Sequence, residues 1–249
     1  MTIASPLLSR ASLAFTLFFL SVYTLIYLDT RLLYGVSVWE KPSKFFLSLA
    51  IHMATLAWGI SLLPAEQRRS LGIHIASLAF LAAAVFEMAY MIFQASRGEA
   101  SHFNTSTPFH DFMYSLMGFG AVTLTGTTAY IGWRIRKSGT SVLQFAAGWS
   151  FIVSALTTTL VAGALAQGAG HWIGGDQTDA TGLPFFHWST TGGDLRVAHF
   201  AALHIMQAVP LMAWFWPDKR IATAALIAGV GVVGGLTAQA LMGLPLFRI

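Results

Sequence analysis

Long runs of apolar residues, separated by short polar connections, repeat along almost the whole chain. Each run is long enough for a helix that crosses a bilayer, which takes roughly 20 residues. The pattern therefore predicts an all-α, polytopic integral membrane protein in which residues 1–249 form one domain, a bundle of seven transmembrane helices. We expect these helices near residues 11–34, 43–63, 70–96, 110–134, 141–169, 194–216 and 220–244.

The charges in the connections indicate how the bundle is oriented. Three short connections, at residues 64–70, 134–141 and 217–220, are basic, and Arg10 precedes the first run on the same side. Because Lys and Arg collect on the cytoplasmic side, the N-terminus is expected to be cytoplasmic and the C-terminus external. The first run is too long for the apolar part of a cleavable signal, so we interpret it as a spanning helix of an inner or plasma membrane.

The outward connections are longer and chemically richer than the inward ones. They cover residues 34–43, 97–109 and 170–193, and the last holds two histidines, two aspartates and two tryptophans. Loops of this length are often lids or binding loops, while tryptophans at this level are also typical of an interfacial aromatic belt. We expect these outer loops to roof a site inside the bundle and to limit access to it.

Composition agrees with a membrane protein and excludes several kinds of site. Hydrophobic residues make up 55% of the chain and charged residues only 10%, against about 25% charged in soluble domains. The basic excess is small and lies at the ends of apolar runs, so we expect the lipid bilayer as a partner and no nucleic acid. With no cysteine, the chain has no thiolate metal site and no attachment motif for c-type haem.

Ionisable residues inside three of the runs are the main functional signal. Such residues are costly in a membrane and are by default candidates for a functional site. At a helical rise of about 1.5 Å per residue, His52, Glu87 and His204 lie ~13–15 Å from the outer ends of their runs. The sequence thus predicts that these three side chains share one level near the middle of the bilayer. His199 is expected about a turn and a half closer to the outside.

These residue types fit more than one cofactor. Two imidazoles from different helices can ligate b-type haem, with Lys44 or Arg196 meeting the propionates. With Glu87 they form a set of two histidines and one carboxylate, which suits a mononuclear non-haem transition metal such as Fe, Zn or Cu. His199 and His204 are five residues apart, which leaves them about 140° apart on a regular helix. A π-bulge would be needed to bring both to one metal.

Ser48 and His52, spaced Ser-x-x-x-His, are followed by a histidine pair on a late helix. This arrangement resembles the ceramidase and adiponectin-receptor superfamily of seven-helix zinc hydrolases. The resemblance implies that Ser48 supports catalysis beside the metal, that His52 is a zinc ligand, and that His199 and His204 are the other ligands. The resemblance covers only these residues. Four residues separate His199 from His204, where the superfamily has three, and this pair lies on the sixth run instead of the seventh.

Three classes of function remain open at this point. The first is a metalloprotein with Glu87 and the histidines at its site, acting on a quinone or lipid by redox or hydrolytic chemistry. The second is a transporter or channel in which the buried His and Glu side chains relay ions or protons. The third is a structural or assembly protein without a cofactor. In the last run, Gly231 and Gly235 form a GxxxG motif, which predicts close helix packing within the bundle or between protomers of a homo-oligomer.

Overall fold

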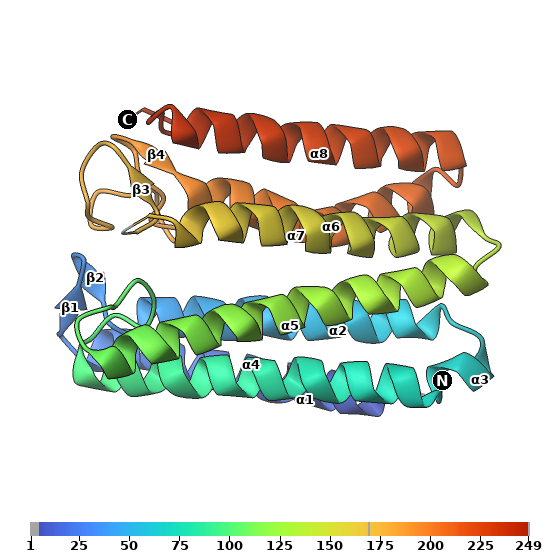
Figure 1. Ribbon diagram of the computed structural model, residues 1–249, viewed down its shortest axis with the longest axis horizontal. Helices are drawn as coiled ribbons and strands as arrows, with labels where there is room; N and C mark the ends of the chain where they lie inside the picture. The colour runs from blue at the N-terminus through green and yellow to red at the C-terminus, as the bar shows by residue number, and fades with distance from the viewer. Residues whose placement is uncertain (1–4, 169, 249) are drawn as a thin grey trace.

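The computed structural model describes residues 5–168 and 170–248, and seven long helices run side by side along its longest axis (Figure 1). The two chain ends lie at opposite ends of the bundle (Figure 1). The long helices are α1 (Pro6–Leu28), α2 (Glu40–Ser61), α4 (Leu71–Arg97), α5 (Pro108–Ser138), α6 (Val142–Ala166), α7 (Leu195–Phe215) and α8 (Lys219–Leu241), and a short α3 (Ala65–Arg68) joins α2 to α4. Two antiparallel ladders, β1 (Leu32–Leu33) with β2 (Val36–Ser37) and β3 (Trp172–Ile173) with β4 (Gly193–Asp194), lie in the outward connections.

Six of these helices are long and apolar enough to cross a membrane: α1, α2, α4, α6, α7 and α8. This confirms the all-α class and a multi-pass membrane protein. The exception is α5, which has 31 residues but is less apolar because glycine and threonine replace larger side chains. The hydroxyls of Thr123, Thr127 and Thr128 donate to carbonyls of the same helix, so this polarity is satisfied inside α5. The seventh crossing stays a prediction.

Several helix ends differ from those expected. The first helix begins at Pro6 and stops at Leu28, six residues before the predicted end. It stops there because Asp29 accepts hydrogen bonds from Arg31 and Trp39, which turns the chain into the β1–β2 hairpin. The second helix begins at Glu40 instead of residue 43. The fifth predicted helix corresponds to α6, and residue 169, its expected end, lies outside the described residues.

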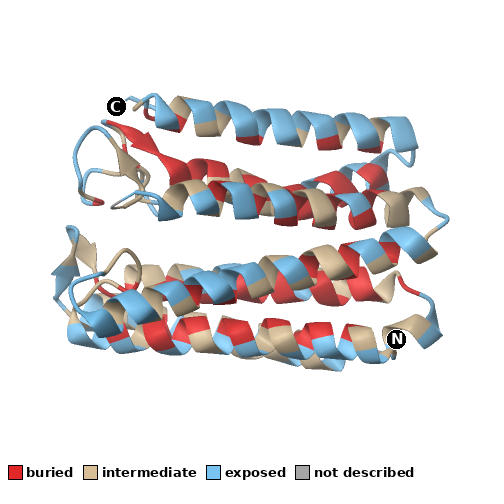
Figure 2. Cartoon of the chain, viewed as in Figure 1, coloured by how far each residue is buried: buried red, intermediate tan, exposed pale blue. Residues whose placement is uncertain are grey.

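The helices bury two separate hydrophobic cores (Figure 2). The first lobe, which consists of α1, α2, α4 and α5, packs around large buried side chains such as Met53, Leu56 and Phe80. The second lobe, which consists of α6, α7 and α8, packs around smaller ones, mainly alanine and valine. Ala147 and Phe151 of α6 and Met206 of α7 belong to the core of the first lobe. The lobes are therefore distinct in packing, and these three side chains join them.

Glycines bring α5 and α6 together where the lobes meet. An added methyl group at Gly132 would lie 2.7 Å from Cβ of Phe151, and one at Gly148 would lie 2.8 Å from the backbone nitrogen of Arg136. Further along, Thr159 donates a hydrogen bond to Thr125 over 3.0 Å. Beyond this pair the two helices separate toward the end that carries the β ladders (Figure 1). The contact between the lobes is thus tightest at the predicted cytoplasmic end.

Candidate functional site

The long outward connection folds into an ordered roof over the bundle. Its two ends are joined by β3 and β4, and the guanidinium of Arg196 fixes its middle. Nη2 of Arg196 donates to Asp194 over 2.6 Å, to the carbonyl of His187 over 2.6 Å and to Asp179 over 2.8 Å. The Asp194 side chain is only 1% exposed and also caps α7. We call residues 29–39 and 170–194 the outer roof.

Charged contacts inside the roof shift the pKa of two groups. Burial opposes the ionisation of Asp179, but hydrogen bonds from His171 and Arg196 outweigh it and hold the pKa of Asp179 below its usual value. Burial lowers the pKa of His171, and the hydrogen bond to Asp179 offsets only part of this effect. Near neutral pH the roof therefore contains an ionised Asp179 that faces the Arg196 cation.

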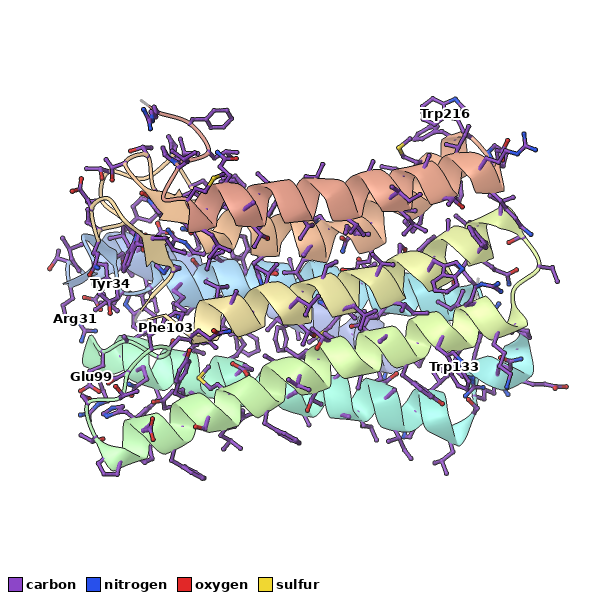
Figure 3. The ribbon with its side chains drawn as sticks, turned by 45° about the horizontal axis from the view of Figure 1, so that its top comes forward. Arg31, Tyr34, Glu99, Phe103, Trp133 and Trp216 are labelled. Atoms are coloured by element: carbon purple, nitrogen blue, oxygen red, sulfur yellow. The ribbon has the colours of Figure 1, made fainter. Side chains whose placement is uncertain are left out.

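The outer roof bridges the two lobes. Asp179 donates its backbone N–H to the carbonyl of Tyr34 over 2.8 Å, and the ring of Tyr34 packs edge-on against Trp172 at 5.2 Å. His187 of the roof lies 3.5 Å from Glu40 at the start of α2. Figure 3 shows Arg31, Tyr34, Glu99 and Phe103 gathered at this end of the bundle, with Trp133 and Trp216 at the other. The roof therefore connects the ends of the two lobes that lie nearest the β ladders.

Lys44 and Arg196, expected as partners for haem propionates, are bonded within the protein. Lys44 pairs with Glu40 over 3.0 Å, and Arg196 is bound by the two roof aspartates. Both cations thus neutralise carboxylates of the chain itself. Ser48 lies on an exposed part of α2, one turn outward from His52. Among the described residues, no hydrogen bond joins it to His52.

His52 and His204 lie at one level of the bundle. The imidazole of His52 bonds Thr128 of α5 through Nε2 over 2.9 Å and packs against the ring of Phe80. Gln207 of α7 donates a hydrogen bond to Thr55 of α2 over 3.1 Å. His204 lies three residues before Gln207, and His52 lies three residues before Thr55, so the two histidines are at the same level. The ring of His204 packs on Phe200 at 4.2 Å.

Glu87 lies further outward than expected, so its predicted depth is wrong. An added methyl group at Gly120 would lie 2.5 Å from Oε1 of Glu87, whereas His52 meets α5 at Thr128. Eight residues of α5 separate these contacts, or ~12 Å at the helical rise. The prediction counted residues from each helix end as if all ends lay in one plane. In the structure these helix ends do not lie in one plane: α2 begins at Glu40, next to the roof, whereas α4 ends at Arg97, in another connection.

Two polar residues of the second lobe face the first. His199 precedes Met206 by seven residues and Thr158 follows Phe151 by seven, so each shares a helix face with a side chain that enters the core of the first lobe. Ser154 donates to the carbonyl of Ala202 over 2.8 Å, which places Thr158 and His199 at similar levels of the antiparallel pair. We call His52, Thr158 and His199 the interlobe site, whereas His204 lines the groove between α7 and α8 beside Ala201 and Ile205.

Several buried polar atoms in this region have no hydrogen-bond partner among the described residues. They include Nδ1 of His199, Oγ1 of Thr158 and Oε1 of Glu87. A buried polar atom without a partner costs free energy, on the order of 1–3 kcal/mol, and such atoms are uncommon in folded proteins. Toward the roof, Nζ of Lys41 lies 5.9 Å from the centre of the Phe45 ring. The unpartnered atoms of His199, Thr158 and Glu87 therefore keep hydrogen-bonding capacity that the described residues do not use.

The described residues do not converge on a single metal. No group of three or more His, Cys, Asp or Glu side chains in residues 5–168 and 170–248 is placed to hold a metal ion. His52 uses Nε2 toward Thr128, and Glu87 lies two turns away. The helix α7 is continuous from Leu195 to Phe215 without a π-bulge, so His199 and His204 stay on different faces. Because the Thr128 hydroxyl already donates to the carbonyl of Leu124, Nε2 of His52 is the donor to Thr128, and Nδ1 is the nitrogen of His52 left to ligate haem or a metal.

Sequence reasoning missed three contributors to this region. Thr128 and Thr158 were hidden among threonines that bond their own helices, and only the orientation of the helices shows which hydroxyl faces the site. Lys41 could have been found from the sequence, because Lys41, Ser48 and His52 are spaced by seven and four residues and share one face of α2.

Comparison of the chain with protein-family models, with curated proteins and with solved structures gives no match.

Proposed function

We propose that this is a seven-span protein of an inner or plasma membrane whose interlobe site binds the polar group of a lipophilic substrate, such as a quinone or a lipid. In this proposal His52 and His199 contact that group, His204 lies on the α8 side of α7, Glu87 lies toward the roof, and the chemistry is redox or hydrolytic. The observation that carries it is the set of unpartnered buried atoms between two separately packed lobes under a closed roof. A merely structural bundle would satisfy these groups or replace them with apolar ones.

The haem or transition metal expected from the sequence stays a prediction within this proposal. It would use Nδ1 of His52, since Nε2 is bonded to Thr128. An absorbance spectrum and an elemental analysis of the purified protein test it directly. A Soret band indicates haem, and stoichiometric Fe, Zn or Cu without that band indicates a non-haem site.

The proposal predicts which histidines hold the native substrate. We expect His52→Ala and His199→Ala to lower the amount of co-purifying lipophile by tenfold or more, because each removes a group that faces the polar end of the ligand. The amount is measured by organic extraction and mass spectrometry of protein in nanodiscs. His74→Ala is the control, since His74 is exposed on α4.

A structural role gives a different result. Each histidine substitution would then lower stability by only about 0.6 kcal/mol, which is typical of a hydrogen bond between membrane helices. The extracted lipophiles of the His52, His199 and His74 variants would be the same. That outcome would contradict the proposed function.

A transporter is the second candidate, and the two-lobe packing favours it. Separate cores on α1–α5 and α6–α8 allow one lobe to rock against the other, which is how many transporters alternate access. In this candidate, Glu87 and the histidines relay ions or protons. Ion or proton flux into proteoliposomes that is lost in Glu87→Gln, together with an unchanged lipophile content in His52→Ala, would favour transport over the first proposal.

The proposed topology has a direct test. With α5 counted as a span, the basic connection at residues 134–141 is cytoplasmic and the outer roof is external. After Arg136, a reporter that works only in the cytoplasm should therefore be active. At Asp176, a reporter that works only outside the cytoplasm should be active. If both positions report the same side, then α6 does not cross, and the proposed seven-span orientation is refuted.

We also propose that α8 is the contact surface of a homo-oligomer. An added methyl group at Gly231, Gly234 or Gly235 would meet no atom within 4 Å, whereas one at Gly229 would meet Ile205 at 3.2 Å. Of these glycines, only Gly229 therefore packs within the bundle. The GxxxG face formed by Gly231 and Gly235 is left free for another helix.

A further inference from the structure

The cations at one end of the bundle have no acidic partner among the described residues. We call this end, which carries α3 and the connections at residues 134–141 and 217–220, the inner end (Figure 1). Every ion pair of the described residues lies at the opposite end. Asp218, an acid of the inner end, instead caps α8 by accepting from the backbone N–H of Arg220. The positive charge of the inner end is therefore not neutralised within the protein.

Two of these cations, from different lobes, converge on one aromatic ring. Cζ of Arg136, in the last turn of α5, lies 5.6 Å from the centre of the Phe145 ring in α6. Nζ of Lys219, at the start of α8, lies 5.8 Å from the centre of the same ring. The Arg136 guanidinium is also 5.6 Å from the ring of Trp149, one turn further along α6. Each lobe therefore brings one cation to the aromatic pair of Phe145 and Trp149.

Backbone packing fixes the base of the Arg136 side chain at this place. An added methyl group at Gly148 of α6 would lie 2.8 Å from Cβ of Arg136 and 2.9 Å from its Cα. Arg136 thus begins at the close contact of α5 with α6, while Arg136 and Lys219 both remain exposed. The attraction between a cation and an aromatic face helps to hold each charge beside the ring. It leaves the charge itself available to an anion.

Membrane topology accounts for basic residues at the inner end but not for their convergence. The positive-inside rule requires only that Lys and Arg lie in the connections, as Arg69 does in the exposed connection after α3. Arg136 and Lys219 instead meet beside rings that face the bilayer, since Trp149 is 38% exposed and Trp133, on α5, is 47% exposed. Tryptophans at the interface lie at the level of the lipid headgroups. The two cations are therefore placed where a lipid has its phosphate.

A phosphodiester group matches this pair of cations. Its oxygens accept hydrogen bonds from the planar fork of an arginine, and a lysine binds it as a point charge. A zwitterionic headgroup also carries a cation, which Arg136 and Lys219 would repel, whereas an anionic headgroup does not. Basic pockets between membrane helices are known to bind the headgroups of acidic lipids on the cytoplasmic side. The charge of the pair therefore selects an anionic phospholipid over a zwitterionic one.

We propose that Arg136, Lys219 and the aromatic pair of Phe145 and Trp149 bind the headgroup of an anionic phospholipid from the leaflet at the inner end. The phosphodiester contacts both cations, and the acyl chains extend along the exposed ring of Trp149. A lipid bound in this way links the two lobes at the end where α5 and α6 pack most closely. The inference does not depend on the substrate of the interlobe site, so the two proposals can fail separately.

The test measures the binding of two lipids to the full chain in neutral detergent micelles. Native mass spectrometry gives the dissociation constant of the first bound phosphatidylglycerol and of the first bound phosphatidylcholine. Phosphatidylglycerol should bind at least tenfold more tightly. Arg136→Gln and Lys219→Gln should each weaken its binding about fivefold, the usual effect of one basic residue near an anionic surface. The binding of phosphatidylcholine should not change in either variant.

Two further variants separate this site from the net charge of the inner end. Arg69→Gln removes one charge at the same end but away from the aromatic pair, so it should weaken phosphatidylglycerol binding less than twofold. Phe145→Leu keeps every charge and should still weaken the binding about threefold, because both cations lose the ring beside them. Brominated phosphatidylglycerol should quench tryptophan fluorescence, and Trp149→Phe should reduce the part of the signal that is quenched.

Three results would overturn the proposal. The first is equal affinity of the unaltered chain for the two lipids. The second is an equal loss in Arg69→Gln and Arg136→Gln, which would show only a general attraction to a basic surface. The third is displacement of phosphatidylglycerol by an equal concentration of glycerol 3-phosphate, which would show that a free phosphate is the ligand. If Arg136→Gln does not fold, Lys219→Gln is compared with Arg69→Gln in its place, since Lys219 is exposed at the start of α8.

Discussion

Arg196→Met is expected to lower the free energy of unfolding by about 3–5 kcal/mol, the usual effect of removing one partner from a buried ion pair. The reason is that Asp194, whose side chain is 1% exposed, would keep its charge without its cation. Asp179 would lose the same partner, and the carbonyl of His187 would lose its donor. The outer roof should therefore loosen first. Unfolding by sodium dodecyl sulfate in mixed micelles, followed by circular dichroism, measures the change.

Two further variants separate charge burial from general damage. Arg97→Met removes an exposed pair with Glu99, in which the Arg97 side chain is 54% exposed, so it should change stability by less than about 1 kcal/mol. Adding Asp194→Asn to Arg196→Met removes the stranded charge and should restore part of the loss. If Arg196→Met and Arg97→Met behave alike, then the roof does not depend on the buried network.

Gly132→Leu is expected to separate α5 from α6, with a loss of about 3 kcal/mol, at the upper end of the range for overpacked positions. A Cβ atom at this position would lie 2.7 Å from Cβ of Phe151, 2.8 Å from the carbonyl oxygen of Gly148 and 3.1 Å from the nitrogen of Ile152. Two of these three atoms are backbone and cannot turn away. Displacement of Phe151 would also open the core of the first lobe. The same detergent titration measures the effect.

The matched control lies on the same helix. At Gly126 an added methyl group would meet no atom within 4 Å, and leucine favours a helix more than glycine does. Gly126→Leu should therefore leave stability unchanged or raise it slightly. A similar loss in both variants would show that the effect comes from the bulk of leucine in α5 and not from the contact with α6.

Local sequence was sufficient for the helices but not for their ends. The apolar runs located six helices long and apolar enough to cross a membrane, because a long apolar segment can cross a bilayer only with its backbone bonds satisfied internally. The end of α1 at Leu28 depends on Asp29, which binds Arg31 and Trp39. Nothing in the hydropathy pattern identifies these partners. The glycine pattern was similarly incomplete, since Gly132 and Gly148 pack closely while Gly231 and Gly235 do not.

The candidate site shows the same division. The sequence alone determined which ionisable residues lie inside the long apolar helices, because their type and position in each run can be counted. Tertiary structure decided that His52 and His204 are level, that Glu87 lies ~12 Å further outward, and that Thr158 and His199 face the other lobe. It also decided that Arg196 is bound by the two roof aspartates. The physical reason is that stagger and rotation of packed helices depend on side chains distant in sequence, which no local period records.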